Sequence, residues 1–256
     1  MSAKRRVQRG FDELLPTGLL LLSALLAWEL VVRLANVPTY LVPAPSMVAI
    51  RWLRDPLFFL TEGGVSLAEA LGGLVIGGGA ALLAGLLMAR LRWLERALLP
   101  LALVLKMTPV VVVAPLFVLW FGFGPAPRVL IAALLTFFPV LIGAVSGLRA
   151  VPGAARDVLA TLDASALDEV WLLRLPAALP YLFAAFKVSA TLALLGAVIA
   201  EWVGGDRGLG RDILLANSNL DTPTTLAGVV TLAAIGLALV GALSLLERRL
   251  VFWRLE

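Results

Sequence analysis

Apolar stretches of about twenty residues recur along this 256-residue chain, and they limit its fold more than any other feature. The hydrocarbon core of a bilayer is about 30 Å thick, so a helix needs about 20 apolar residues to cross it. Hydrophobic residues make up 61% of the chain and charged residues only 15%, whereas soluble domains average about 25% charged residues. The sequence therefore predicts an all-α integral membrane protein.

Six apolar stretches are long enough to form transmembrane helices, and we expect one membrane domain over residues 1–256. The expected spans are residues 14–34, 65–89, 97–121, 128–148, 178–203 and 224–246. The first follows a basic head, but its apolar part is longer than that of a signal peptide and no small-residue cleavage pattern follows it. We therefore expect an uncleaved first span after a short cytoplasmic tail, residues 1–13.

The Lys and Arg residues predict the orientation, because positive residues are enriched in cytoplasmic loops. With the N-terminus inside, thirteen of the 21 Lys and Arg residues fall on the cytoplasmic side and six on the outer side. Both termini are thus expected in the cytoplasm, and this distribution accounts for the net charge of +4 without nucleic-acid binding. Residues 36–64 then form an external loop, in which Pro45 and Ser46 predict the start of a short helix on the membrane surface.

Two polar pairs have structural interpretations. Ser66-x-x-Glu69 has the spacing of a capping box, which predicts that a helix begins there, at the start of the second span. Glu29 and Arg33 are four residues apart, a spacing that favours an ion pair on one helix face.

The glycine-rich run GGLVIGGGAALLAG has no adjoining Lys-Ser or Lys-Thr, so Gly73-x-x-x-Gly77 indicates close helix packing rather than a phosphate-binding loop. The chain has only three lysines, and Ala, Leu and Phe precede Lys4, Lys106 and Lys187 respectively. None of them completes a Walker A motif, so an ATP-driven mechanism requires a separate ATPase subunit.

The chain has no cysteine and no histidine. This absence removes thiol nucleophiles, disulfides, the usual zinc and haem ligands and the commonest general base. Carboxylate-only chemistry stays open, but no nucleophile–base pair is evident. We expect no catalytic residue, no metal site and no cofactor in this chain.

Residues 151–176 form a short, charged, amphipathic insert between the fourth and fifth spans. Pro152 and Gly153 break the preceding span, and residues 153–162 read as a short helix followed by a turn at Asp163 and Ala164. Helices this short are marginal alone, so the insert needs packing from the membrane domain or from a partner.

A second short helix follows in the insert. Ser165-x-x-Asp168 is a capping box, and the apolar residues within 167–175 fall on one helix face. Pro176 is expected to end this helix, and Pro180 to lie in the first turn of the next span.

The insert, ARDVLATLDASALDEVWLLRLPAALP, resembles the EAA loop of ABC-importer permeases. LVPAPSMV, KMTPVVVVAPLFVLWFGFG, TFFPVLIGAVSGLRAV and LLGAVIAEWVGGDRGLG resemble the branch that serves taurine, alkanesulfonates, nitrate and vitamin or pyrimidine precursors. The resemblance runs from about residue 40 to the C-terminus. Asp163 stands where the family usually has Gly, and Asp157 stands near the family's Glu. Asp tolerates a left-handed turn, so the bend is expected to survive.

The resemblance implies a permease subunit in a prokaryotic inner membrane. Its implied partners are a second copy of the permease, two ATPase subunits that bind ATP and Mg²⁺, and an external substrate-binding protein. The two short helices of the insert would be cytoplasmic coupling helices that dock into the ATPase. The implied coupling residues are Ala155, Arg156, Asp157, Ala160, Leu162, Asp163, Ala164, Ser165 and Pro176.

Ionisable and helix-breaking residues within spans are candidates for the translocation pathway. For each there is a structural alternative: snorkelling or ion pairing for the lysines, pairing with a nearby Arg for Glu201, and core packing for the aromatics. The candidates are Lys106, Thr108, Pro109, Phe137, Phe138, Lys187 and Glu201.

A gradient-driven secondary transporter is the alternative function. It would be expected to show inverted repeats and carboxylates near mid-span, and neither is evident in the sequence. The transported solute stays open among sulfonates, taurine, nitrate, riboflavin and pyrimidine or thiamine precursors.

Overall fold

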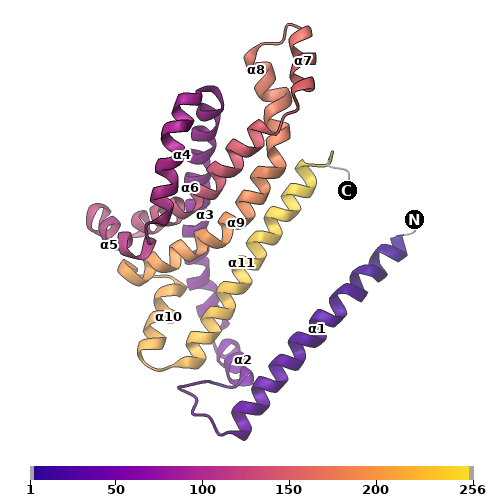
Figure 1. Ribbon diagram of the computed structural model, residues 1–256. Helices are drawn as coiled ribbons and strands as arrows, with labels where there is room; N and C mark the ends of the chain where they lie inside the picture. Colours follow the sequence, from indigo (N-terminus) through magenta and orange to yellow (C-terminus); the bar gives the residue numbers. More distant parts are fainter. Residues whose placement is uncertain (1–2, 254–256) are drawn as a thin grey trace. The chain divides into compact units, whose positions relative to one another are not determined.

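The computed structural model describes residues 3–253 of the chain. Side chains are described from residue 15 onward, apart from those of Arg92, residues 101–103, Leu105, Lys106, Ala160 and Ala166. Within residues 3–253 the regular secondary structure is helical and no β-strand is present (Figure 1). The all-α prediction is confirmed.

The elements follow one another with short connections. In chain order they are α1 (Ala3–Leu34), α2 (Pro45–Arg54), α3 (Pro56–Arg90), α4 (Arg92–Met107), α5 (Val110–Phe121), α6 (Pro125–Arg149), α7 (Gly153–Thr161), α8 (Ala166–Asp168), a π-helical segment (Glu169–Arg174), α9 (Leu175–Gly204), α10 (Leu209–Ser218) and α11 (Thr222–Leu250).

Five helical stretches in the described part of the chain are long and apolar enough to cross a membrane. They are Leu15–Leu34, Pro56–Arg90, Pro125–Arg149, Glu169–Gly204 and Thr222–Leu250. The predicted span at residues 97–121 is not one helix, because α4 ends at Met107 and α5 begins at Val110. Pro109 lacks a backbone N–H and disfavours helical geometry at Thr108, so it divides the stretch into two shorter helices.

The chain divides into two compact units. The first unit consists of the residues up to Phe59 together with Ile213–Val230, and the second consists of Leu60–Asp212 together with the residues from Thr231 onward. The prediction of one domain over residues 1–256 stays a prediction.

The second unit is built around α6 and α9, which pack against each other along much of their length (Figure 1). Its core is rich in alanine, with Ala132 and Ala193 fully buried, and small side chains allow helix backbones to approach closely. A Cβ atom on Gly73 would collide with Ala132, and one on Gly77 would collide with the backbone of Ala133. The close packing predicted from Gly73-x-x-x-Gly77 is confirmed.

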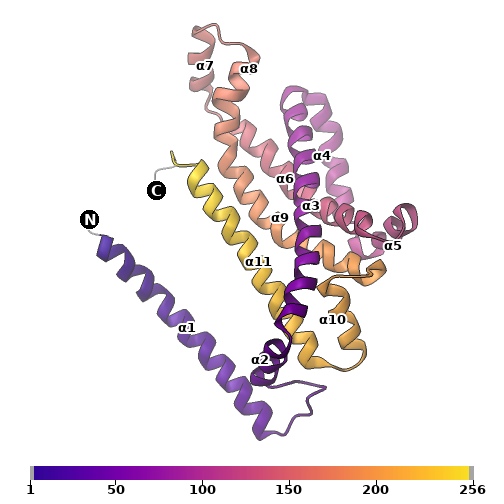
Figure 2. The ribbon, with the colours of Figure 1, turned by 180° about the vertical axis from the view of Figure 1, so that it is seen from behind.

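In the first unit α1 and α2 lie next to each other (Figure 2), and Glu29 of α1 holds the start of α2. Its carboxylate accepts hydrogen bonds from the backbone N–H of Ser46, at 3.0 Å, and from the Ser46 hydroxyl, at 2.8 Å. The same carboxylate pairs with Arg33 at 2.5 Å, so the predicted ion pair is confirmed. The short helix predicted in the 36–64 loop is α2, which begins at Pro45 as expected.

The predicted helix start at Ser66 is wrong, because α3 already begins at Pro56 and passes through this position. The Asp55 carboxylate accepts a hydrogen bond from the backbone N–H of Phe58, and Pro56 occupies the first turn, where its missing N–H costs nothing. Ser66 and Glu69 therefore lie inside a helix, and both are buried there.

Candidate functional site

The insert begins with α7, which ends in a left-handed turn. Asp163 has φ +50°, so the expected left-handed conformation is observed with Asp where glycine would carry no steric penalty. The Ala164 N–H donates to the Leu159 carbonyl at 3.2 Å, which closes the turn. The chain therefore reverses direction at the predicted position.

The second half of the insert begins with the predicted capping box. The Ser165 hydroxyl accepts a hydrogen bond from the Asp168 N–H at 3.2 Å, and the Asp168 carboxylate accepts one from the Ser165 N–H at 2.9 Å. Hydrogen bonds from the side chain and the backbone N–H of Ser165 hold the pKa of Asp168 below its usual value, because they stabilise the carboxylate form. The capping-box prediction is confirmed.

The prediction that Pro176 ends this second helix is wrong. The chain continues through the π-helical segment directly into α9, and the Leu175 N–H donates to the carbonyl of Val170, five residues earlier. Pro176, which has no N–H to donate, falls in the first turn of α9, where a missing donor is tolerated. Pro180 lies inside α9 rather than in its first turn, so the insert's second helix and the following span are one continuous helical stretch.

The tip of the insert exposes large apolar side chains. Figures 1 and 2 show α7 and α8 as a pair of short helices extending beyond the ends of α6 and α9. The side chains of Leu162 and Trp171 are 71% and 67% exposed, and Val158, Leu167 and Leu172 are also exposed. We call these five residues the apolar tip. An exposed apolar cluster of this kind is typical of an interaction surface.

The predicted coupling residues lie in the same insert as the apolar tip, and Leu162 belongs to both sets. Ala155, Arg156, Ala164 and Pro176 are half-buried, whereas Asp157, Leu162, Asp163 and Ser165 are exposed. The side chain of Ala160 lies outside the described residues. Arg156 and Arg174 both face Glu169, at 3.6 Å and 2.8 Å, which joins α7 to the π-helical segment.

A second cluster, the buried ion network, is centred on Arg128 at the start of α6. Its guanidinium lies 2.6 Å from Glu69 of α3 and 2.6 Å from Asp206, and it donates to the carbonyl oxygens of Gly124 and Arg207. The side chains of Arg128 and Glu69 are each only 4% exposed. Asp206 lies outside the spans, and its own backbone N–H and the Arg128 charge lower the pKa of its carboxyl.

Glu201 of α9, beside Glu69, holds the start of α10. Its carboxylate accepts hydrogen bonds from the backbone N–H groups of Gly210, at 2.6 Å, and Arg211, at 3.2 Å. The expected partner was an Arg side chain, but the carboxylate binds backbone N–H groups of a helix start, where the helix dipole favours negative charge. Gly208 has φ +113°, and a Cβ there would collide with the Glu201 carboxylate.

Two residues of α3 also bind the segment between α9 and α10. Glu62 accepts hydrogen bonds from the Arg207 guanidinium, at 2.8 Å, and from the Gly208 N–H, at 2.9 Å. The Ser66 hydroxyl accepts one from the Leu209 N–H at 3.0 Å. The segment between α9 and α10 is therefore fixed by side chains of α3, α6 and α9.

The remaining pathway candidates lie in different surroundings. Lys106 is in α4, with its side chain outside the described residues, and Thr108 and Pro109 form the break before α5. Lys187 forms an ion pair with Glu247 of α11.

Phe137 and Phe138 pack edge to face, with ring centroids 5.4 Å apart. Phe138 is buried, and Phe137 packs against the core between α6 and α9. Their surroundings are those of core residues.

Sequence reasoning missed the buried ion network. In the sequence, Arg128 is only one of the six outer-side positive charges, Ser66-x-x-Glu69 predicts only a helix cap, and nothing singles out Asp206. The available signal was an ionisable residue at the edge of an apolar span, which is costly to bury without a partner.

The chain is similar to known membrane transport proteins. Residues 80–252 match the family described as binding-protein-dependent transport system inner membrane component. The riboflavin transport system permease protein RibX of Chloroflexus aurantiacus is 40% identical over 244 residues, which cover 93% of this chain and 89% of RibX.

Two further relatives cover most of the chain. The formylaminopyrimidine transport permease protein ThiX of Halalkalibacterium halodurans is 32% identical, covering 97% of this chain and 99% of ThiX. The putative aliphatic sulfonates transport permease protein SsuC of Bacillus subtilis is also 32% identical, covering 93% and 87%.

A solved structure shares the fold. A chain of the MetNI methionine ABC transporter, in inward facing conformations, aligns with a TM-score of 0.61 and 16% identity. The alignment covers 75% of this chain and 96% of that chain.

Proposed function

Because this chain belongs to the family of binding-protein-dependent inner membrane transport components, and is thus an ABC-importer permease, we propose that its insert docks on a separate ATPase subunit. The chain is a multi-pass inner membrane protein. In this proposal it forms the translocation path for a small solute that an external binding protein delivers.

The apolar tip is the observation that carries the docking proposal. Leu162 and Trp171 are largely exposed on a helix pair that the Asp163 turn and the Ser165 cap hold in one shape. Large apolar side chains presented on a preformed helix pair suit a hydrophobic groove, because little conformational entropy is lost on docking. The predicted orientation places this tip in the cytoplasm, on the side where ATP is available.

The ATPase subunit supplies the energy. No Walker A motif is present in this sequence, which supports a partner that would bind ATP and Mg²⁺, with two ATPase copies for two permeases. Closure of the ATPase dimer would move the inserts. Since the second half of each insert is continuous with α9, that movement would pass into the span as a rigid-body shift and give alternating access.

The break between α4 and α5 fits a transport path. Thr108 and Pro109 interrupt the helix within an apolar region, and non-helical backbone at membrane depth is tolerated where it faces protein or a water-filled cavity. Riboflavin is the first solute to test, because RibX has the highest identity of the three relatives named above.

Co-purification tests the docking proposal. The tagged chain would be expressed with a genomically adjacent ATPase, and ATP hydrolysis measured with and without the external binding protein. Ala164→Trp and Leu162→Glu, both at the insert's turn, are expected to reduce recovery of the complex and stimulated hydrolysis at least tenfold. Ala234→Trp, on an exposed face of α11, is the control and is expected to retain both.

Folding of each variant would be checked by gel filtration and Trp fluorescence. Wild-type complex yield and hydrolysis in both folded insert variants would overturn the docking proposal. A folded chain that binds no ATPase, yet moves solute down an ion gradient, would favour the secondary transporter.

A further inference from the structure

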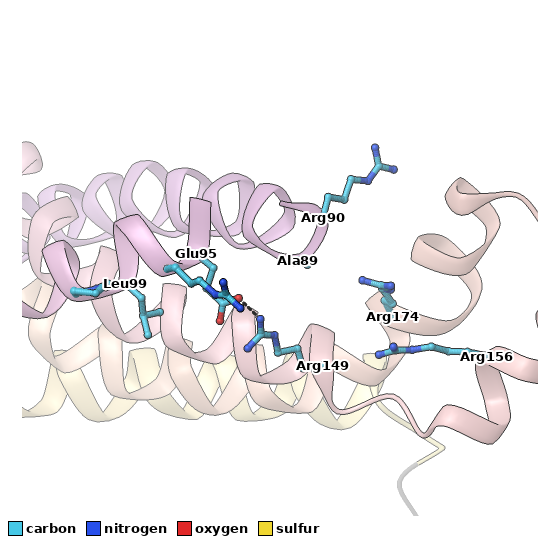
Figure 3. A pocket seen from close by; sticks show the side chains of 9 residues that line it. Ala89, Arg90, Glu95, Leu99, Arg149, Arg156 and Arg174 are labelled. Atoms are coloured by element: carbon cyan, nitrogen blue, oxygen red, sulfur yellow. Dashed lines mark hydrogen bonds and ion pairs between the residues drawn. The ribbon is translucent and has the colours of Figure 1, made fainter. Parts of the chain in front are cut away.

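An arginine-lined cavity of about 1030 Å³ lies in the second unit, near the ends of α3 and α6 (Figure 3). It is bounded by the first half of α4 and by two helical segments of the insert, α7 and the π-helical segment. Its charged lining residues are Arg90, Glu95, Arg96, Arg149, Arg156 and Arg174. Five guanidinium groups thus share the cavity with one carboxylate.

The positive charge of this cavity is only partly neutralised. Glu95 pairs with Arg149, as the dashed line in Figure 3 shows, and Arg156 and Arg174 share Glu169, which lies outside the cavity. No ion pair involving Arg90 or Arg96 occurs among the described residues.

Arg156 adds an unsatisfied donor. Its Nε is buried and has no hydrogen-bond partner among the residues that the structure describes, and the Glu169 carboxylate lies 3.6 Å away. Buried N–H groups are normally hydrogen-bonded, so this donor is left for a further acceptor.

The position of the cavity at the ends of two spans indicates the kind of ligand. Arg90 is the last residue of one membrane-spanning helix and Arg149 is the last residue of another. Span ends lie where the hydrocarbon core meets the lipid headgroups. Planar guanidinium groups bind phosphate through paired, charge-assisted hydrogen bonds. We propose that this cavity binds the phosphate headgroup of an anionic phospholipid.

A bound headgroup would link the insert to the spans. Arg156 and Arg174 belong to the insert, whereas Arg90 and Arg149 belong to α3 and α6. One phosphate between them would hold the base of the insert against the membrane domain. The further consequence, that anionic lipid raises stimulated ATP hydrolysis, rests on the proposed docking function, whereas headgroup binding itself does not.

Lipid binding would be measured on the purified full-length chain by native mass spectrometry, with phosphatidylglycerol or phosphatidylcholine added at matched concentrations. The test variant is Arg90→Gln/Arg96→Gln, since both side chains are exposed and their loss leaves no partner unpaired in the described residues. A basic residue near the membrane surface contributes about fivefold in affinity, so the double variant is expected to bind phosphatidylglycerol on the order of 25-fold more weakly.

The matched control is Arg248→Gln/Arg249→Gln in the last turn of α11, which removes the same charge away from the cavity. It is expected to keep wild-type binding of phosphatidylglycerol, and phosphatidylcholine binding is expected to be unchanged in both variants. Arg156→Gln, tested separately, is expected to reduce phosphatidylglycerol binding at least fivefold.

Equal loss of phosphatidylglycerol in the test and control variants would show that general charge, not this cavity, holds the lipid, and would overturn the proposal. Displacement of the lipid by equimolar inorganic phosphate would assign the site to a free phosphate compound instead. The readout is the mass of bound lipid and does not depend on the ATPase. A chain that binds phosphatidylglycerol but no ATPase would contradict the docking function and leave this proposal standing.

Discussion

Replacing Arg128 with Met tests whether the buried ion network holds the segment between α9 and α10. The guanidinium is 4% exposed and lies 2.6 Å from both Glu69 and Asp206. Methionine fills a similar volume but donates no hydrogen bond and carries no charge. The substitution therefore leaves Glu69 buried beside Glu201 without its counter-charge.

The expected loss of stability is large. Removing one partner of a buried ion pair costs about 3–5 kcal/mol, because the remaining charge stays buried without compensation. Replacing both partners by apolar residues of similar size is often close to neutral. The double variant Arg128→Met/Glu69→Met is therefore expected to recover most of the stability that Arg128→Met loses.

The assay is denaturant titration in mild detergent, followed by Trp fluorescence. Arg33→Met is the control, because Arg33 also pairs with a glutamate but its side chain is 65% exposed, and an exposed pair contributes less than about 1 kcal/mol. Hydrogen exchange of residues 205–212 is expected to rise in Arg128→Met. A loss no larger than that of Arg33→Met, or a double variant no more stable than the single one, would refute the reasoning.

Four further predictions concern packing and the insert. Gly77→Ala is expected to lower the melting temperature by several degrees because its Cβ meets the backbone of Ala133, while Gly79→Ala, with open space around it, leaves the melting temperature unchanged. Asp163→Gly is expected to stabilise the turn by about 1 kcal/mol, since φ +50° carries no penalty for glycine, and hydrogen exchange across residues 159–165 would slow. Ser165→Ala is expected to cost the insert about 1 kcal/mol by the same measurement, and slower exchange than in wild type would contradict the cap. Because the pKa of the capping carboxylate is lowered from 3.8, the cap stabilises the insert above pH 3.8 and loses this effect as pH falls further, which circular dichroism across pH 2–6 would detect.

Local patterns were reliable where the interaction partners are close in the sequence. The turn at Asp163 and the Glu29–Arg33 pair each involve residues within a few positions of one another, and both were predicted correctly. The capping-box spacing that is correct at Ser165 is misleading at Ser66, because the helix has already begun at Pro56, ten residues earlier. A spacing rule identifies a possible cap but does not show whether the preceding residues are already helical.

Proline positions alone did not predict where helices end. Pro109 divides the predicted third span into α4 and α5, which local stereochemistry explains after the fact. Pro176 does not end its helix, because the π-helical register before it accommodates the missing donor. Whether a proline ends a helix depends on the hydrogen bonds available around it.

The sequence by itself determined the membrane class, the position of the insert along the chain and the lack of a Walker A motif, because hydrophobic content, short-range spacing and motif content are properties of the linear chain. Only the tertiary structure decided which ionisable residues meet. Glu69, Arg128 and Asp206 lie far apart in the sequence, and no local rule pairs them. Arg128 and Glu69 come together because a buried charge is stable only beside an opposite charge, and helix packing alone brings such partners within reach.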